Sequence, residues 1–378
     1  MADALAMFLD HHLAEAHCPG ALVQVEQAGR VLARQAAGRV RPGSEAPMHW
    51  GARFRIASLT KPVVTAAALM LCDEGRLDLD APLTDSLHEL RALRLRDGSA
   101  PRRAPTARDL MRHTSGFAYP FELPEAALRQ RLLGAGFTAA LSGLDTPGFL
   151  QQLAALPLVA EPGTVFRYGY STDVLGCLIE RLEGARLGEV LARRLFGPLG
   201  MAATGFEIAP GTPADELAEA FADDRAWHAQ IPGIGQRRAG APSMDSGGGG
   251  LVSTLDDYAR FARLLAQGGV AADGPAAGQR LLSAAAMAGI FSNQLPEGVD
   301  GPAAYCGPGF GFGLGLAVRL ADGLAAMPCQ PGEGVWSGIS GTAMFVRPAD
   351  GWFALLFSAN MASRMMARMV FRRAVGRL

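Results

Sequence analysis

The chain has 378 residues, of which 49% are hydrophobic and 19% charged. This composition is typical of globular domains and excludes disorder as the main state. A formal net charge of -1 at pH 7, without a basic block, gives no electrostatic basis for binding nucleic acid. The longest strongly apolar run, Val63 to Cys72, is about half as long as a bilayer requires, so we expect no membrane segment. Residues 1–17 predict an amphipathic helix rather than a signal peptide, because no basic segment precedes the apolar positions.

The next part of the chain predicts strands followed by a buried helix. Residues 21–27 and 31–36 predict two strands joined by a short turn, and residues 53–57 predict a third. This third strand leads into a helix over residues 58–75, with Ser58 at its cap and a glycine at its end. Apolar residues occupy nearly all faces of that helix, so we expect it to be buried at the centre of the molecule.

The middle of the chain is predicted to be rich in loops and helices, and strands return near the end. The predicted helices cover residues 106–112, 146–156, 172–182, 187–196 and 254–267. Four consecutive glycines at 247–250 are flexible enough to form a loop over a cleft. Late strands are predicted at 310–316, where apolar residues alternate with glycines, and at 342–347 and 352–358, before a closing helix over 362–375.

Strands at both ends of the chain, with helices between them, indicate one sheet built from both chain ends. We therefore expect a discontinuous α/β domain made of residues 1–75 and 300–378. Residues 76–245 would form a mainly helical inserted domain, with 246–299 at the domain junction. The active site would lie in the cleft between the two domains.

The five cysteines are scattered, odd in number and contain no Cys-x-x-Cys pair. They are Cys18, Cys72, Cys177, Cys306 and Cys329. We interpret them as reduced, non-catalytic thiols of a cytoplasmic protein.

Lysine usage is the most informative feature of the composition. Of the 35 basic residues only Lys61 is a lysine, so arginine serves wherever any cation is sufficient. Lysine can release its proton when it is desolvated, whereas arginine keeps its proton in proteins. Lys61 lies three positions after Ser58, which places both side chains on one face at the start of the predicted helix. There the amine can accept the proton of the serine hydroxyl, which makes Ser58 a candidate nucleophile.

Two further segments offer groups for the same chemistry. Tyr168 and Tyr170 lie in a loop that leads into the helix predicted from residue 172, and a tyrosine can act as a second acid and base. The segment from Trp336 to Thr342 predicts a glycine-rich edge strand whose backbone approaches a ligand closely. A backbone N–H of this strand and that of Ser58 would together form an oxyanion hole.

Other catalytic signatures do not occur. The sequence contains no Gly-x-Ser-x-Gly, and Lys61 follows a threonine rather than the glycine of a phosphate-binding loop. The seven histidines have no metal-ligand spacing. We expect no metal and no cofactor.

Taken together, the motifs resemble those of the serine β-lactamase and penicillin-binding superfamily, in its class C branch. They occur in the expected order as RIASLTKPV, TARDLMRHTSGF, PGTVFRYGYSTDVLG, LFGPLGMAATGF, SGGGGLVSTLDDYARFARLL and WSGISGT. The resemblance implies an α+β fold with an antiparallel sheet flanked by the terminal helices and an inserted, mostly helical domain. It implies Ser58 as nucleophile, Lys61 as its proton partner and Tyr168 as the second acid and base. The backbone N–H groups of Ile339 and Ser58 would stabilise the oxyanion.

Departures from the family pattern indicate the substrate. Trp336 stands where β-lactamases and carboxypeptidases of this group carry a Lys or His facing the substrate carboxylate, as in the esterase branch, and Gly338 follows in the same binding segment. Tyr170 replaces the usual asparagine after the motif tyrosine. His113, in RHTSG, matches a structural position in the family, so we expect it to be non-catalytic. An apolar, aromatic pocket favours uncharged esters.

The main hypothesis is a carboxylesterase, closest to family VIII, that cleaves short-chain acyl esters through an acyl-enzyme. An acyltransferase that uses the same acyl-enzyme is the first alternative. A β-lactamase, or a D-amino-acid amidase or peptidase, with weak esterase activity is the second. A non-catalytic binding protein that kept the fold is the third. The expected partner is a small-molecule ester, and the sequence does not indicate an oligomeric state.

Overall fold

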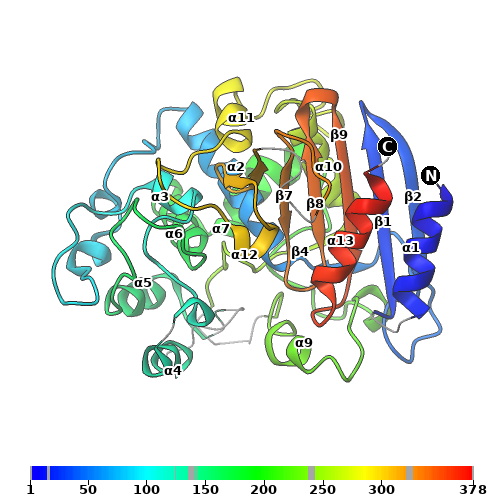
Figure 1. Ribbon diagram of the computed structural model, residues 1–378, viewed down its shortest axis with the longest axis horizontal. Helices are drawn as coiled ribbons and strands as arrows, with labels where there is room; N and C mark the ends of the chain where they lie inside the picture. Colours follow the sequence, from blue (N-terminus) through cyan, green and yellow to red (C-terminus); the bar gives the residue numbers. More distant parts are fainter. Residues whose placement is uncertain are drawn as a thin grey trace.

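A computed structural model gives the arrangement of the elements along the chain (Figure 1). It describes residues 2–14, 18–123, 125–134, 141, 143–236, 243–320 and 327–376. Residues 1 and 15–17 of the predicted N-terminal helix lie outside the described residues.

A seven-stranded sheet forms the centre of the molecule, and a separate pair of short strands lies beside it. The strands are β1 (Gly20–Gln27), β2 (Arg30–Gly38), β3 (Arg53–Arg55), β4 (Val252–Thr254), β5 (Phe310–Phe312), β6 (Ala317–Arg319), β7 (Gly334–Ser337), β8 (Ala343–Arg347) and β9 (Trp352–Ser358). The order in the large sheet is β2-β1-β9-β8-β7-β6-β5, and every neighbouring pair is antiparallel. The first strands of the chain therefore pair with its last strand, which confirms a sheet built from both chain ends.

Thirteen α-helices lie within the described chain. They are α1 (Ala2–Ala14), α2 (Thr60–Asp73), α3 (Ala107–Met111), α4 (Ala126–Gly134), α5 (Thr146–Ala154), α6 (Ser171–Glu183), α7 (Leu187–Leu191), α8 (Gly197–Leu199), α9 (Arg225–Gln230), α10 (Leu255–Ala266), α11 (Ala284–Phe291), α12 (Ala303–Cys306) and α13 (Arg364–Val375). Helix α10 begins as its sequence predicts, because the side chain of Thr254 accepts a hydrogen bond from the Asp257 N–H.

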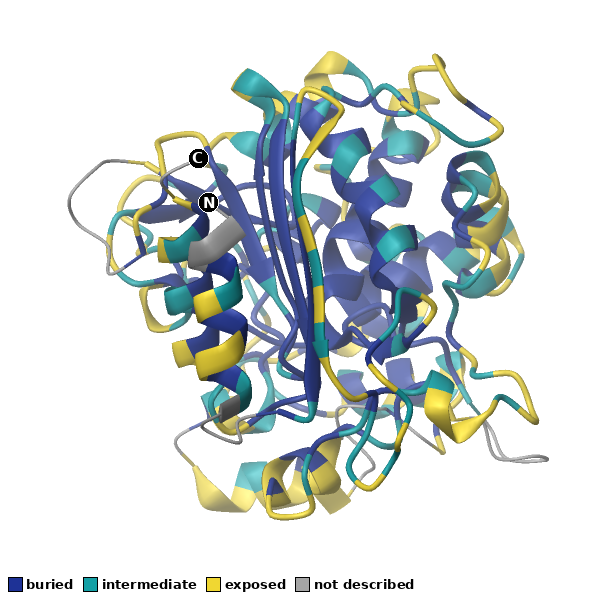
Figure 2. Ribbon diagram, turned by 90° about the vertical axis from the view of Figure 1, so that its right-hand side faces the viewer, coloured by how far each residue is buried: buried dark blue, intermediate teal, exposed yellow. Residues whose placement is uncertain are grey.

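The helices cover both faces of the large sheet. Helices α1 and α13 pack together on one face, α10 packs on the other, and α2 lies between the sheet and the helices α3 and α6 (Figure 1). Eleven residues of α2 are buried, as the apolar character of all its faces predicts. The other strands of the large sheet and α2 form the buried interior, whereas the edge strand β2 has no buried residue, and exposed residues gather on loops and on the outer sides of helices (Figure 2).

Two strand predictions are wrong. The segment 310–316 does not form one strand, because the chain turns after β5 at residues 313–316, where Gly315 has a φ of 86° that favours glycine. The glycine-rich segment beginning at Trp336 does not form one strand, because β7 ends at Ser337; Trp336 and Ser337 pair with β8 alone, since the pairing with β6 covers only Gly334 and Val335. Strand β3 joins β4 in the small sheet and not the large one.

Within the described ranges, every helix is too short or too polar to cross a lipid bilayer. The α+β architecture is confirmed, and helices α3 to α6 lie to one side of the large sheet (Figure 1). The proposed domain boundaries stay a prediction.

Candidate active site

Ser58 lies in the turn of 3-10 helix, Ala57–Leu59, that joins β3 to α2. It is therefore not the cap of α2, which begins two residues later without a side-chain cap. Ala57 has a φ of 45°, in the left-handed region that costs about 1–2 kcal/mol for a residue with a side chain. The Ile56 N–H donates to the Leu251 carbonyl at 3.0 Å and helps to hold this strained turn. Backbone strain of this kind gathers at functional sites.

Lys61 lies in the first turn of α2 and is buried. Its Nζ donates hydrogen bonds to Ser58 Oγ at 3.3 Å, to Tyr119 OH at 3.1 Å and to the Gly248 carbonyl at 2.6 Å. An ammonium group has three protons, and here three acceptors surround it. The structure thus brings the two residues of the Ser-x-x-Lys pair into contact.

Tyr168 contacts the same serine from another segment of the chain. Its hydroxyl donates to Ser58 Oγ at 2.8 Å, and Lys61 Nζ lies 4.6 Å from the centroid of its ring. The Tyr119 N–H donates to the Tyr168 carbonyl at 3.2 Å and ties the two tyrosine segments together. Two groups able to carry a proton therefore converge on one hydroxyl oxygen.

Tyr119 is a site residue that the sequence interpretation missed. It is one of only five tyrosines and lies two positions after the end of the TARDLMRHTSGF segment, and this nearness to a family motif is the signal that could have identified it. Burial, together with the nearby Asp173 carboxylate, raises the pKa of Tyr119 well above its usual value. The phenol therefore stays protonated and offers Lys61 a neutral oxygen acceptor.

Asp173 is a second residue that the sequence interpretation missed, and it holds the glycine loop in place. Its Oδ1 accepts hydrogen bonds from Ser246 Oγ at 2.6 Å and from the Gly248 N–H at 3.0 Å. A Cβ on Gly248 would lie 2.3 Å from Asp173 Oδ2 and 2.9 Å from Tyr119 OH, so only glycine fits there. The run of glycines predicted as a loop over a cleft therefore packs closely, and it supplies a carbonyl to Lys61. Burial raises the pKa of Asp173, although the charge of Lys61 opposes this effect.

A pocket of about 410 Å³ opens in front of Ser58. Its inner wall includes Tyr168, Tyr170, Gly248 and Ile339, and its outer wall is formed by residues of α4 and α9 and of the turn before α4. Tyr170 is almost completely buried but lines this pocket.

Ile339 lies in the turn between β7 and β8 and lines the pocket with Ser58. Across the part of the chain that the structure describes, its N–H donates to no backbone carbonyl. A backbone donor that is free beside the candidate nucleophile is what an oxyanion hole requires.

Trp336 and Gly338 were expected to line the pocket, but neither is among its lining residues. Trp336 is 5% exposed and packs behind Tyr168, with ring centroids 5.3 Å apart, so it supports the tyrosine instead of forming a pocket wall. A Cβ on Gly338 would lie 2.4 Å from the Ile56 carbonyl. The glycine is needed because β7 approaches the backbone ahead of Ser58, not because it approaches a ligand.

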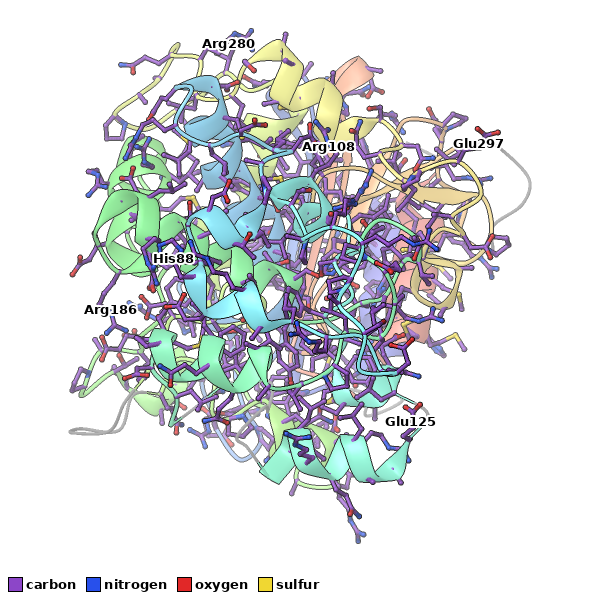
Figure 3. The ribbon with its side chains drawn as sticks, turned by 90° about the vertical axis from the view of Figure 1, so that its left-hand side faces the viewer. His88, Arg108, Glu125, Arg186, Arg280 and Glu297 are labelled. Atoms are coloured by element: carbon purple, nitrogen blue, oxygen red, sulfur yellow. The ribbon has the colours of Figure 1, made fainter. Side chains whose placement is uncertain are left out.

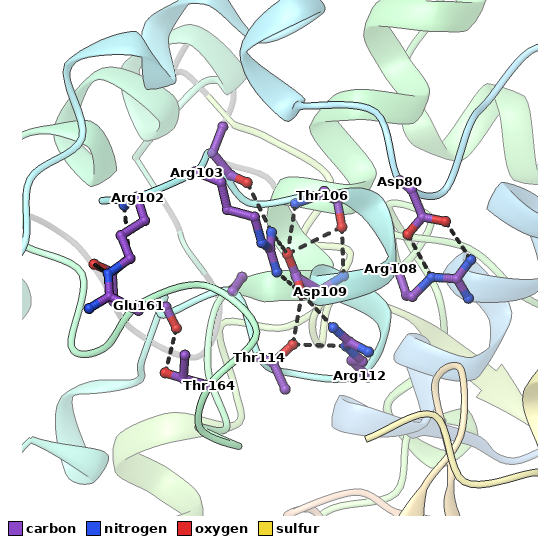
Figure 4. A network of polar contacts seen from close by, with 12 residues as sticks. Asp80, Arg102, Arg103, Thr106, Arg108, Asp109, Arg112, Thr114, Glu161 and Thr164 are labelled. Carbon is purple, nitrogen blue, oxygen red and sulfur yellow. Dashed lines mark hydrogen bonds and ion pairs between the residues drawn. The ribbon is translucent and has the colours of Figure 1, made fainter. Parts of the chain in front are cut away.

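His113 is buried beside the site without a hydrogen bond to the reacting groups. Its ring centroid lies 4.8 Å from that of Tyr168, and its Nδ1 has no hydrogen-bond partner within the described chain. The loop that carries it is anchored by Asp109, whose carboxylate binds Arg103, Arg112 and Thr114 (Figure 4). This placement agrees with a structural role for His113.

The arrangement can perform acyl transfer: a hydroxyl, two proton carriers and a free backbone N–H surround one end of a largely apolar pocket. Among the described residues, no three His, Cys, Asp or Glu side chains gather in a way that could hold a metal ion.

Comparisons with known proteins agree with this geometry. Protein Rv1367c of Mycobacterium tuberculosis is 34% identical over 342 residues, which cover 85% of this chain and 81% of that protein. Esterase EstB of Burkholderia gladioli is 32% identical over 374 residues, covering 95% of this chain and 90% of that protein. The solved structure described as "EstCE1, a hydrolase with promiscuous acyltransferase activity" is similar with a TM-score of 0.84 and 27% identity, covering 99% of this chain and 98% of that chain. A family model described as Beta-lactamase matches residues 5–375, and the chain belongs to that family.

Proposed function

We propose that this protein is a serine carboxylesterase that cleaves short-chain acyl esters through an acyl-enzyme on Ser58. The observation that carries the proposal is the convergence of Lys61 Nζ and Tyr168 OH on Ser58 Oγ beside a largely apolar pocket. The similarity to esterase EstB supports the ester as the reacting group.

The reactive form holds one proton fewer on Lys61 and Tyr168 than the arrangement in which both donate to Ser58. In the first half of the reaction, Ser58 Oγ attacks the ester carbonyl and gives its proton to whichever of these two groups is deprotonated. The negative charge on the carbonyl oxygen is stabilised by the N–H groups of Ser58 and Ile339. The intermediate then breaks the bond to the alcohol, which leaves with a proton from the same pair of side chains. This step produces the alcohol and an ester between the acyl group and Ser58.

In the second half, water attacks the acyl-enzyme and gives one proton to the pair. Ser58 then leaves with that proton, and the carboxylic acid is released. Lys61 and Tyr168 return to their starting states, so no outside acid or base is consumed.

Two finer assignments belong to the same proposal. The tryptophan that opens the WSGISGT segment, in place of Lys or His, supports a place among the family VIII carboxylesterases. The five free cysteines support a reducing compartment, and we propose the cytoplasm.

An acyltransferase is the second candidate, favoured by the similarity to EstCE1, which is described as having promiscuous acyltransferase activity. An acceptor alcohol would replace water in the second half of the reaction. Product analysis with an added alcohol separates the two functions, since transfer yields a new ester in place of the free acid.

The test is hydrolysis of p-nitrophenyl acetate and butyrate by the wild type and by Ser58→Ala, Lys61→Arg and Tyr168→Phe. Proton transfer by a positioned group contributes about 10²–10⁴-fold, so we expect losses of that order for the Lys61 and Tyr168 variants and no turnover for Ser58→Ala. Lys61→Arg retains the charge but loses the ability to accept a proton.

Intact-mass measurement with a fluorophosphonate gives an independent readout. The wild type should gain one adduct that is absent in Ser58→Ala and present in Ser292→Ala, which replaces an exposed serine on the surface. Full esterase activity in Lys61→Arg, or an unmodified Ser58 in the wild type, would contradict the proposal.

A further inference from the structure

The outer wall of the pocket combines exposed apolar side chains with a single positive charge. Phe121 and Leu133 are 64% and 53% exposed, which is unusual for side chains of this size, and both line the pocket. Arg129, on α4 between them in sequence, is the only charged residue among the described residues of the lining. Helices α4 and α9 both lie along the lower edge of the molecule in Figure 1.

Arg129 has no carboxylate partner in the parts of the chain that the structure describes. Its Nη1 donates to the Leu123 carbonyl at 3.0 Å, which fixes the guanidinium and leaves the Nε and Nη2 donors unused. The nearest acid in the sequence, Glu125, forms an ion pair with Arg96 at 2.7 Å. Glu125 lies at the start of α4 at the edge of the molecule (Figure 3).

A guanidinium with one free edge binds a carboxylate through two parallel hydrogen bonds. One unpaired positive charge also matches the single negative charge of a carboxylate. The apolar side chains on either side would cover a hydrocarbon body. The chemistry of this wall is therefore complementary to an amphiphile with an apolar body and an anionic end.

We propose that the preferred substrates are esters that carry a carboxylate at the end remote from the scissile bond, where Arg129 binds it. This inference rests on the proposed esterase function and names its substrate class. The carboxylate can belong to the acyl part, as in a half-ester of a dicarboxylic acid, or to the alcohol part, as in an acylated hydroxy acid. In both cases Arg129 is a specificity residue and takes no part in proton transfer.

The experiment compares two matched substrate pairs. The acyl-side pair is mono-p-nitrophenyl glutarate and its methyl ester, and the alcohol-side pair is p-(butyryloxy)benzoate and its methyl ester. For each pair, the ratio of kcat/KM for the charged member to kcat/KM for the neutral member is measured in the wild type and in Arg129→Gln, Arg129→Lys and Arg131→Gln. Arg131 is the matched control because it lies on the same helix, is exposed and is not part of the pocket lining.

We expect Arg129→Gln to lower the ratio about tenfold in at least one pair, as expected for a half-buried, charge-assisted hydrogen bond. Arg129→Lys should keep part of the ratio, and Arg131→Gln should keep all of it. The pair that responds identifies the side of the ester that carries the carboxylate. Raising NaCl should lower the wild-type ratio, because the interaction is partly exposed to solvent; this measurement carries the test if Arg129→Gln does not fold.

Failure of this inference and failure of the proposed function give different results. An unchanged ratio in Arg129→Gln, an equal fall in Arg131→Gln, or a wild-type ratio that salt does not change overturns the inference while Ser58-dependent hydrolysis continues. If the wild type hydrolyses none of these esters and Ser58 takes no fluorophosphonate, the proposed function itself fails.

Discussion

Lys61 Nζ lies 3.1 Å from the hydroxyl of Tyr119, a residue 58 positions further along the chain. A hydrogen bond to a charged group contributes about 1.5–3 kcal/mol, so this contact helps to keep the amine aimed at Ser58. We therefore expect Tyr119→Phe to lower kcat for p-nitrophenyl butyrate about tenfold, with a smaller effect on KM. The matched control is Tyr305→Phe, which removes the hydroxyl of a neighbouring tyrosine that binds Glu122 and does not contact Lys61. If Tyr119→Phe keeps the wild-type kcat, the prediction is wrong, and Ser58 Oγ and the Gly248 carbonyl are sufficient to orient the amine of Lys61.

Asp173 should act on catalysis through the glycine loop. Asp173→Ala removes the acceptor for Ser246 Oγ and the Gly248 N–H, so the Gly248 carbonyl is no longer held against Lys61. We expect this variant to lose about 1–3 kcal/mol of stability and more than tenfold in kcat. Asp173→Asn retains an acceptor oxygen and should lose less of both. Urea unfolding and ester hydrolysis measure the two effects, and equal behaviour of the two variants would contradict this role.

His113 should make stability depend on pH in the mildly acidic range. Burial, with a smaller contribution from the charge of Lys61, lowers the pKa of His113 well below its usual 6.5. Below pH 6.5 the unfolded chain therefore binds a proton that the folded chain does not, and folding stability is lost as the pH falls. The loss is at most about 1.4 kcal/mol per pH unit, between pH 6.5 and the lower pKa of the folded state.

The measurement is the free energy of unfolding in urea between pH 7.5 and 5, at steps of about half a unit. His113→Asn removes the titrating ring and retains a residue that tolerates the positive φ of 57° at this position, so its stability should depend less on pH. His88→Asn, at an exposed histidine (Figure 3), is the control and should keep the wild-type pH dependence. Parallel profiles for the wild type and His113→Asn would contradict the prediction.

The cysteines should be unreactive in the folded protein. Burial raises the pKa of Cys18, Cys72 and Cys306 to about 12, and it raises the pKa of Cys177 and Cys329 as well. Because the thiolate is the reactive form, iodoacetamide at pH 8 should leave the native protein almost unmodified and fully active. Five alkylations should appear in denaturant. Loss of activity on alkylation of the native protein would contradict a non-catalytic role for these residues.

The sequence by itself determined the features that depend on local spacing. The unique lysine stands three positions after a serine, and a helical turn places residues three apart on one face, so their contact could be expected. The paired strands near the two chain ends and the buried helix α2 were readable from apolar patterns for the same reason. The resemblance to the β-lactamase family supplied Tyr168, which no local pattern connects with Ser58.

Only the tertiary structure decided which distant segments meet. Gly248 is 187 positions from Lys61, and its carbonyl contacts Nζ because Asp173 fixes the loop. Trp336 was expected in the pocket but packs behind Tyr168, and Arg129 joins the pocket wall from a helix with no motif. Contacts of this kind depend on how elements pack and on side-chain volume and charge at the place where they meet. Spacing along the chain does not contain that information.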